Sequence, residues 1–170
     1  HMDFTEDSIA RVKTFWQSPT MATQSGLMAV DMFDAIDEGK IKAVWIMATN
    51  PVVSLPNADK VKHALKKCDL VVISDCIDLT DTGDLAHVKL PATGWSEKDG
   101  TVTNSERRIS RQRGLFQPAG NAMHDWQIIC EVAKRMGFNE GFNYHHQAEI
   151  FREHAALSGF ENSDTPNHKR

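Results

Sequence analysis

Two short runs of apolar residues constrain the fold more than any other feature of the sequence. They are "IKAVWIM" at residues 41–47 and "LVVISD" at residues 70–75. Both runs are rich in β-branched residues and lack polar alternation, which is typical of parallel strands covered on both faces. Between them, Pro56 and Asn57 can start a helix whose apolar stripe ends at Cys68. The pattern predicts a strand–helix–strand unit with a right-handed crossover.

Further elements extend this unit in both directions. Apolar spacing predicts helices at about 5–17, 27–38, 125–136 and 147–157, and a third strand at "HVKLP", residues 87–91. Gly39 and Gly137 follow two of these helices, at the position where glycine commonly ends a helix. We therefore expect an α/β fold with three layers, in which helices flank a mainly parallel sheet, as in Rossmann-like cofactor-binding domains.

Length and composition set the domain organisation. The chain has 170 residues, of which 41% are hydrophobic and 25% charged, enough for one sizeable core. We expect an N-terminal helix and linker at 1–25, an α/β domain at 26–160 and a polar tail at 161–170. His1 and Met2 are typical of a cloning remnant, so we expect a piece of a longer protein.

Several classes of protein are disfavoured. The sequence has no apolar run of 18 residues and no secretory signal, which predicts a cytoplasmic protein that does not enter a membrane. A formal net charge of -4 and a pI near 6.1 argue against a dedicated nucleic-acid binder. Cys68, Cys76 and Cys130 form no C-x-x-C pair, so we expect reduced thiols rather than disulfides or a zinc site.

Candidate binding residues follow the ends of the expected strands, because ligands of open parallel sheets bind at the carboxyl ends of the strands. Asn50 follows the first strand, Ser74 and Asp75 end the second, and Lys98 follows the third. A carboxylate at Asp75 suits ribose hydroxyls or the N–H groups of guanine, although a turn or helix-cap role is an open alternative for Asn50 and Asp75. No G-x-G-x-x-G follows the first strand, which disfavours an ordinary NAD site.

The stretch "WSEKDGTVTNSERRISRQRG", residues 95–114, concentrates positive charge. An ammonium group at Lys98 suits a phosphate or another electron-rich group. The alternative is that the basic side chains pair with acidic neighbours; the residues concerned are Arg107, Arg108, Arg111 and Arg113, with Glu97, Asp99 and Glu106. His146 and His154 are about 12 Å apart along a helix, which disfavours a shared metal ion.

Four segments together carry a resemblance to a known family. They are "GLMAVDMFDAIDEGKIKAVWIMATNPVVSLPN", "DLVVISD", "HVKLPATGWSEKDGTVTNSERRISRQRG" and "HDWQIICEVAKRMGF". In this order and spacing they resemble the molybdopterin oxidoreductase superfamily, and within it the catalytic subunit of assimilatory nitrate reductase. The resemblance runs from about residue 3 to residue 160. Each segment alone is weakly specific, whereas the ordered combination is strongly so.

The resemblance implies a function for the whole enzyme. Its relatives bind molybdenum through two molybdopterin guanine dinucleotides (Mo-bis-MGD), receive electrons through an iron–sulfur cluster, and reduce nitrate to nitrite. This chain would hold one dinucleotide arm, and the residues that match cofactor contacts are Asn50, Ser74, Asp75, Lys98 and Asp125. The family's cluster-binding cysteines and molybdenum ligand have no match here. We therefore expect the piece alone to be inactive and to bind no cofactor.

The resemblance also implies partners and leaves alternatives open. The partners would be the remaining domains of the same polypeptide, an electron donor and nitrate. The same motif pattern occurs in formate dehydrogenases, so the equivalent domain of such an enzyme is one alternative. A standalone nucleotide-binding or adaptor domain is another, because the sequence carries no evident catalytic machinery.

Overall fold

The computed structural model describes residues 3–161 and divides the chain into two compact units. Among the described residues, the first unit comprises 3–26, 99–112 and 132–161, and the second comprises 27–98 and 113–131. The units are therefore interleaved along the sequence, and the division falls within one helix. All five predicted site residues belong to the second unit, which we call the sheet unit.

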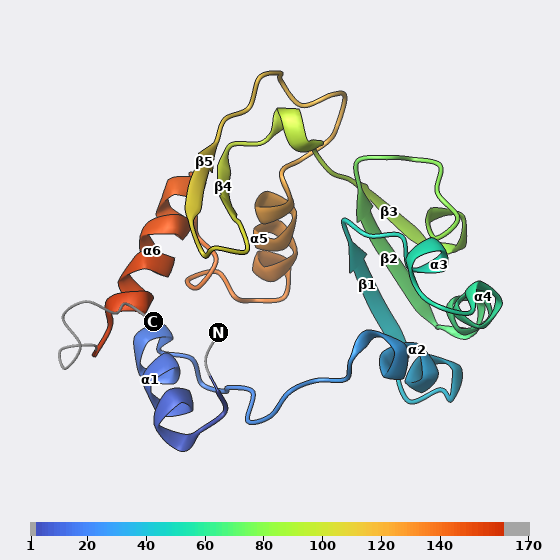
Figure 1. Cartoon of the computed structure of the whole chain (residues 1–170), viewed down its shortest axis with the longest axis horizontal. Helices are drawn as coiled ribbons and strands as arrows, with labels where there is room; N and C mark the ends of the chain where they lie inside the picture. Colours follow the sequence, from blue (N-terminus) through green and yellow to red (C-terminus); the bar gives the residue numbers. More distant parts are fainter. Residues whose placement is uncertain (1–2, 162–170) are drawn as a thin grey trace. The chain divides into compact units, whose positions relative to one another are not determined.

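A three-stranded parallel sheet forms the centre of the sheet unit (Figure 1). Its strands are β1 (Ala43–Met47), β2 (Leu70–Asp75) and β3 (Val88–Pro91), in the spatial order β1-β2-β3. Met47 pairs with Ser74, and Asp75 pairs with Pro91, so the three strands reach their carboxyl ends in register. The predicted parallel α/β fold is confirmed.

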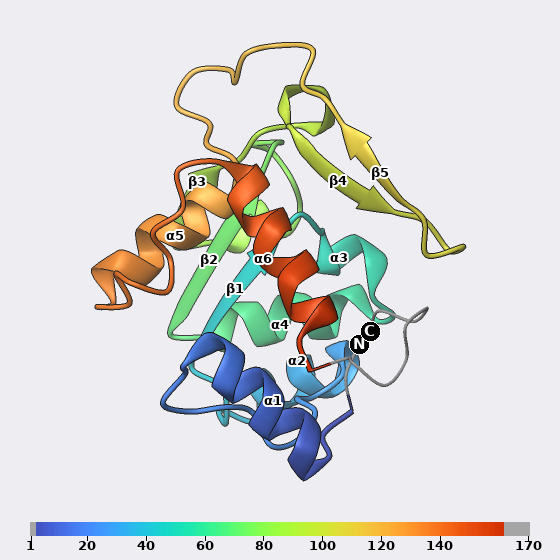
Figure 2. The ribbon, with the colours of Figure 1, turned by 90° about the vertical axis from the view of Figure 1, so that its left-hand side faces the viewer.

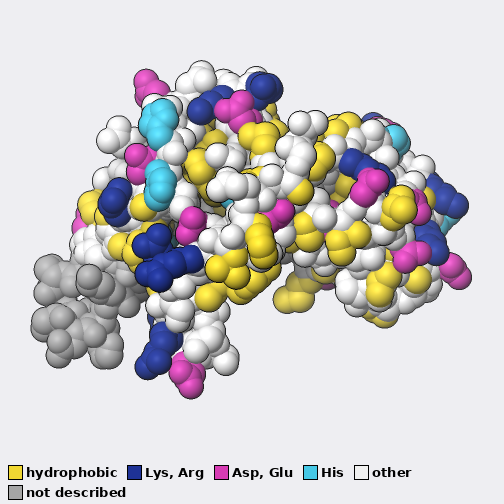
Figure 3. Space-filling view, turned by 90° about the horizontal axis from the view of Figure 1, so that it is seen from above, with side chains coloured by type: hydrophobic (Ala, Val, Ile, Leu, Met, Phe, Trp, Pro, Cys, Tyr) yellow, Lys and Arg dark blue, Asp and Glu magenta, His cyan; other side chains and the backbone are white. Residues whose placement is uncertain are grey.

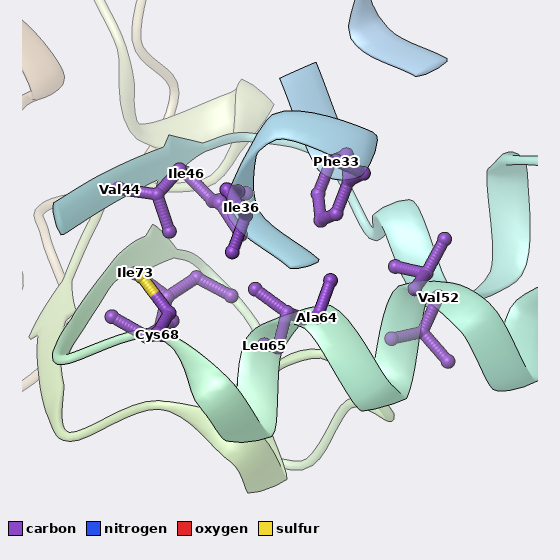
Figure 4. Packing of buried hydrophobic residues seen from close by; sticks show 11 residues of the cluster. Phe33, Ile36, Val44, Ile46, Val52, Ala64, Leu65, Cys68 and Ile73 are labelled. Atoms are coloured by element: carbon purple, nitrogen blue, oxygen red, sulfur yellow. The ribbon is translucent and has the colours of Figure 1, made fainter. Parts of the chain in front are cut away.

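Helices α2 (Ala29–Asp37), α3 (Pro51–Ser54) and α4 (Ala58–Lys67) cover one face of this sheet. Alternate residues of β1 and β2 point into the core they share with the helices, as Figure 4 shows for Val44, Ile46 and Ile73. Ile36 and Leu65 are almost fully buried there. Burying a side chain of this size stabilises the fold by about 1.5–3 kcal/mol, so this cluster fixes how the sheet and its helices pack.

The ends of these helices follow from particular residues. Gly39 lies just beyond α2 with a φ of 75°, which a residue with a Cβ adopts only under strain, and it lets the chain turn directly into β1. Asn57 caps α4, because its side chain accepts a hydrogen bond of 3.2 Å from the N–H of Lys60. These local signals place β1 and β2 on either side of the α4 crossover.

The chain after β3 stays in the sheet unit as far as Lys98. The short helix η1 (Gly83–Leu85) connects β2 to β3, and η2 (Trp95–Glu97) follows β3. Ala92 then forms a parallel bridge with Met123, so the segment before α5 (Asp125–Arg135) extends beside β3. The start of α5 is thereby tied to the carboxyl end of the sheet.

In its described residues, the other unit contains two complete helices and a hairpin, together with the last turn of α5. The complete elements are α1 (Glu6–Trp16), α6 (Gln147–Gly159) and the antiparallel pair β4 (Gly100–Thr103) and β5 (Ile109–Gln112) (Figure 2). The indole Nε1 of Trp16 donates a hydrogen bond of 2.8 Å to Glu153, and the rings of Phe15 and Phe160 pack edge to face with centroids 5.3 Å apart. These contacts join α1 to the C-terminal end of the described chain.

The structure adds elements that the sequence did not predict. The hairpin β4–β5, the one-turn helix α3 and the short helix η2 are the main additions, whereas the other α-helices lie within about two residues of their predicted bounds. The domain boundaries at residues 25 and 160 stay a prediction. Residues 1–2 and the predicted tail from 162 onward lie outside the described residues. Between residues 3 and 161, no helix combines the length and apolar character needed to span a bilayer.

Candidate functional site

The carboxyl ends of β1, β2 and β3 lie at one edge of the sheet, as their register requires. The loops that leave this edge carry Asn50, Asp75 and Lys98, and the bridge between Ala92 and Met123 brings Asp125 to the same end of the unit. We call this edge the strand-end edge. The prediction that consecutive strands deliver polar groups to one edge is therefore consistent with the backbone.

Asn50 is held by a neighbouring loop. Its side-chain oxygen accepts a hydrogen bond of 2.6 Å from the hydroxyl of Thr82, which is fully buried. The same hydroxyl accepts a bond of 3.2 Å from the N–H of Val52, the second residue of α3. The amide oxygen of Asn50 is thus used within the fold, while its amide nitrogen carries two donors for another group.

Ser74 is fully buried in the middle strand. Its hydroxyl accepts a hydrogen bond of 2.8 Å from the indole Nε1 of Trp45, one strand away. This bond satisfies a half-buried donor inside the sheet, so the side chain of Ser74 has a structural role of its own. Its predicted contact with a cofactor remains a prediction.

Asp75 lines a pocket of about 360 Å³ at the strand-end edge. The walls come from the end of β2, from β3, from η1 and from residues 94–97 and 119–122. One carboxylate oxygen, Oδ1, accepts a bond of 3.1 Å from the N–H of Ile77, and no donor to Oδ2 is recorded among residues 3–161. Among the described residues that line this pocket, Asp75 is the only one of the five predicted site residues.

The other carboxylates and the lysine of the pocket are already paired. Lys89 binds Asp78 through its carboxylate at 3.2 Å and its carbonyl at 2.9 Å. Glu97 accepts bonds from two backbone N–H groups. Asp75 differs from them because, within the described chain, its carboxylate accepts a bond only from a backbone N–H, whereas Asp78 is paired with a lysine and Glu97 uses both of its oxygens.

Lys98 and Asp125 form an ion pair, with 29% and 28% of their side chains exposed. The ammonium of Lys98 contacts Oδ2 of Asp125. The second carboxylate oxygen, Oδ1, is buried and has no hydrogen-bond partner among the described residues, and the same holds for Nε1 of Trp126. A buried acceptor without a partner is costly, so the start of α5 holds polar atoms that a ligand can satisfy.

Two residues near this pair escaped the sequence reasoning. Glu97 was considered only as a partner for arginines, yet both of its oxygens bind backbone N–H groups. The G-x-x-E spacing from Gly94 matches half of a helix-start capping box, and that signal would have identified it. His124, whose Nδ1 lies 3.0 Å from the hydroxyl of Thr93, had no comparable signal.

Three of the four arginines, Arg107, Arg108 and Arg111, lie in the hairpin of the other unit, whereas Arg113 follows β5 and belongs to the sheet unit. Arg111 lies 3.8 Å from Asp99, which agrees with the expected pairing of opposite charges. On the face in Figure 3, Lys and Arg side chains lie beside Asp and Glu side chains at several places. Within residues 3–161, no three His, Cys, Asp or Glu side chains are grouped closely enough to hold a metal ion.

A family comparison decides what kind of chain this is. The family model described as "Molybdopterin oxidoreductase" matches residues 9–135, three quarters of the sequence. The chain belongs to the molybdopterin oxidoreductase family. The resemblance predicted from its motifs is thus confirmed.

Two curated relatives show where the chain lies within the molybdopterin oxidoreductases. A nitrate reductase of Klebsiella oxytoca is 54% identical over 162 residues, which cover 95% of this chain and 19% of that protein. The F420-dependent formate dehydrogenase subunit alpha of Methanocaldococcus jannaschii is 42% identical over 149 residues, covering 87% of this chain and 22% of that protein. The chain spans about a fifth of the length of these relatives.

A solved structure supports the family fold. The acetylene hydratase from Pelobacter acetylenicus matches with a TM-score of 0.67 and 28% identity, over 79% of this chain and 19% of that one. A chain of the molybdopterin oxidoreductase family thus shares its α/β architecture with part of a much larger protein.

The structure shows which of the five predicted site residues of this molybdopterin oxidoreductase contact one another and which contact other parts of the fold. It joins Lys98 to Asp125, places Asp75 at the pocket, and commits the side chains of Asn50 and Ser74 to Thr82 and Trp45. Lys98 follows directly after Glu97, which lines the pocket with Asp75. The assignment of these residues to a cofactor remains a prediction.

Proposed function

We propose that this chain is the part of a molybdenum-dependent nitrate reductase that holds one guanine dinucleotide arm of the cofactor. The observation that carries this proposal is the 54% identity with a nitrate reductase over 95% of the chain. The whole enzyme reduces nitrate to nitrite in nitrate assimilation. Its iron–sulfur cluster, its electron donor and the remaining domains lie outside this chain, and we place it in the cytoplasm.

The donors and acceptors at the strand-end edge fit such a group. A carboxylate with an uncommitted oxygen at Asp75 suits the N–H groups of guanine, and the ammonium of Lys98 suits a phosphate or the electron-rich pterin. The buried Oδ1 of Asp125 lacks a partner in the described chain, which favours a ligand with a donor. Asn50 would contribute its amide nitrogen and Ser74 its hydroxyl proton.

The chain contributes binding and orientation. When bound, the molybdenum cofactor supplies the oxygen-atom transfer, and the residues named above hold and orient it. The packed core of the sheet unit keeps the binding residues at fixed positions, because the loops that carry them leave strands held in register with one another. We accordingly expect the isolated chain to be inactive.

The test is the cofactor content of the full-length enzyme. We expect Asp75→Ala to lower molybdenum content and the amount of GMP released by acid hydrolysis, together with nitrate reduction. Asp69→Ala is the matched control, because Asp69 is an exposed carboxylate directly before the same strand, at its opposite end. Normal loading in Asp75→Ala would refute the assignment, as would an equal loss in both variants.

A formate dehydrogenase is the second candidate, favoured by the 42% identity over 87% of the chain. Both candidates use the same kind of cofactor site, so the residues of this chain do not separate them. Assays of the purified full-length enzyme for nitrate reduction and for formate oxidation decide between them. Formate oxidation without nitrate reduction would replace our proposal with this alternative.

A further inference from the structure

Glu97 joins two segments that are distant in the sequence. Its Oε2 accepts a hydrogen bond of 2.7 Å from the N–H of Gly94, and its Oε1 accepts one of 3.2 Å from the N–H of Ala119. Both segments line the pocket at the strand-end edge. One carboxylate thus bonds the loop after β3 to the loop before α5.

The backbone around Glu97 reinforces this connection. The carbonyl of Ser96 accepts bonds from the N–H groups of Leu115, at 2.7 Å, and Phe116, at 3.2 Å. A Cβ on Gly114 would approach the Glu97 carbonyl to 3.3 Å, so the two segments lie close together here. The contact between the loops is therefore built from both backbone and side-chain bonds.

Lys98 follows Glu97 and reaches Asp125 from this fixed loop. A charged side chain holds its partner well only where its own backbone is fixed, because a long flexible lysine otherwise loses rotamer entropy on pairing. The only carboxylate of residues 94–98 belongs to Glu97, and both of its oxygens serve backbone N–H groups. Its role is therefore to hold the loop.

We propose that Glu97 is a positioning residue that holds the pocket wall and directs Lys98 toward Asp125. The proposal deepens the proposed function, since it takes Lys98 as a cofactor contact. A carboxylate suits the task because two N–H groups need two acceptors on one side chain. Glutamine offers one acceptor and one NH₂ group, and the NH₂ group would oppose one of the N–H donors.

Amide hydrogen exchange on the 170-residue chain tests the clamp without any cofactor. We expect Glu97→Ala to speed exchange at the N–H groups of Gly94 and Ala119 by roughly tenfold, because each loses a bond to a charged acceptor. Glu97→Gln should speed exchange at one of the two. Glu106→Gln, the same change at an exposed glutamate of the hairpin, should alter neither.

The variants cover the possible outcomes. Unchanged exchange at both N–H groups in a folded Glu97→Ala protein would overturn the proposal. If Glu97→Ala does not fold, Glu97→Gln decides: loss of protection at one N–H group supports the clamp, and full protection at both overturns it.

A double-mutant cycle tests whether Glu97 acts through Lys98. We expect Lys98→Met to raise the unfolding equilibrium constant several-fold less in the Glu97→Ala background than in the wild-type background, because the pair is already weakened there. If Glu97 does not act through Lys98, Lys98→Met would raise the unfolding equilibrium constant by the same factor in both backgrounds, and that result would overturn the proposal.

The two proposals fail separately. Loss of the clamp appears in hydrogen exchange of the isolated chain, whereas the proposed function is tested by the molybdenum and GMP content of the full-length enzyme. If exchange is faster in Glu97→Ala but the full-length Asp75→Ala enzyme contains normal amounts of molybdenum and GMP, the clamp is supported and the cofactor assignment is rejected.

Discussion

The ion pair between Lys98 and Asp125 makes a quantitative prediction. Replacing Lys98 with methionine keeps the length of the side chain but leaves the Asp125 carboxylate, whose Oδ1 already lacks a partner, without Lys98. With less than a third of each side chain exposed, the cost should lie between that of a surface pair, about 0–1 kcal/mol, and that of a broken buried pair, about 3–5 kcal/mol. Because Asp125 begins α5, the helix dipole offsets about 0.5 kcal/mol of the loss. We expect Lys98→Met to lower the free energy of unfolding by about 2 kcal/mol.

The reverse truncation should cost less. In Asp125→Asn the ammonium of Lys98 can turn toward water, so we expect a loss of about 1 kcal/mol. The double variant should be more stable than the sum of the two losses implies, with a coupling of about 1 kcal/mol. Urea unfolding of the chain, followed by circular dichroism, measures all three values.

A surface pair provides the control. Lys40 binds Glu38 at 2.6 Å, with 72% and 55% of the side chains exposed, so Lys40→Met should leave the urea midpoint unchanged. A midpoint for Lys98→Met equal to that of wild type would refute the reasoning. So would strictly additive losses, because they would mean that the two charges do not interact.

Three further predictions concern the sheet unit. Gly39→Ala should destabilise the chain by about 1 kcal/mol because Gly39 has a positive φ, whereas Gly26→Ala, at a glycine without one, should not. Calorimetry compares the unfolding midpoints of the two variants, and equal midpoints would show that the turn at Gly39 carries no strain. Ser74→Ala should cost about 1–2 kcal/mol in wild type and little in a Trp45→Phe background, and an equal loss of unfolding free energy in both would rule out their bond as the cause. The hydrogen bond from Lys67 lowers the pKa of Asp37 below its ordinary value of 3.8. The ionised Asp37 therefore stabilises the fold fully when the pH is above this ordinary value, and the stabilisation is lost as the pH falls through the lowered pKa. Urea midpoints measured between about pH 5 and about pH 2.5 should therefore fall more for wild type than for Asp37→Asn, and parallel curves would contradict this assignment.

The sequence predicted the sheet because burial leaves a continuous apolar signal. Strands β1 and β2 alternate between a shared core and a partly exposed face, and the one charged residue in them, Asp75, lies at the very end of β2, so the apolar run is not interrupted. The hairpin β4–β5 gave no such signal, because most of its residues are exposed. Helix α3 was missed because its four residues, a single turn that begins at Pro51, are too few to repeat an apolar pattern at helical spacing.

The site was only partly predictable for a related reason. The rule that ligands bind at strand ends predicts Asp75 and Lys98 as candidates, since it depends only on order along the chain, and the structure places both at or after strand ends of the sheet. The partners of these residues depend on loops that fold back: Thr82 meets Asn50 from 32 positions away, and Ala119 meets Glu97 from 22 positions away. No local pattern encodes such contacts, and they decide which polar atoms remain free for a ligand.

A crystal structure of the cofactor-loaded full-length enzyme tests the central claim most directly. We predict that the guanine of one dinucleotide arm lies at the strand-end edge, with the Asp75 carboxylate within hydrogen-bonding distance of its N–H groups. A dinucleotide bound at the amino ends of β1, β2 and β3, or one that makes no contact with the sheet unit, would contradict the account.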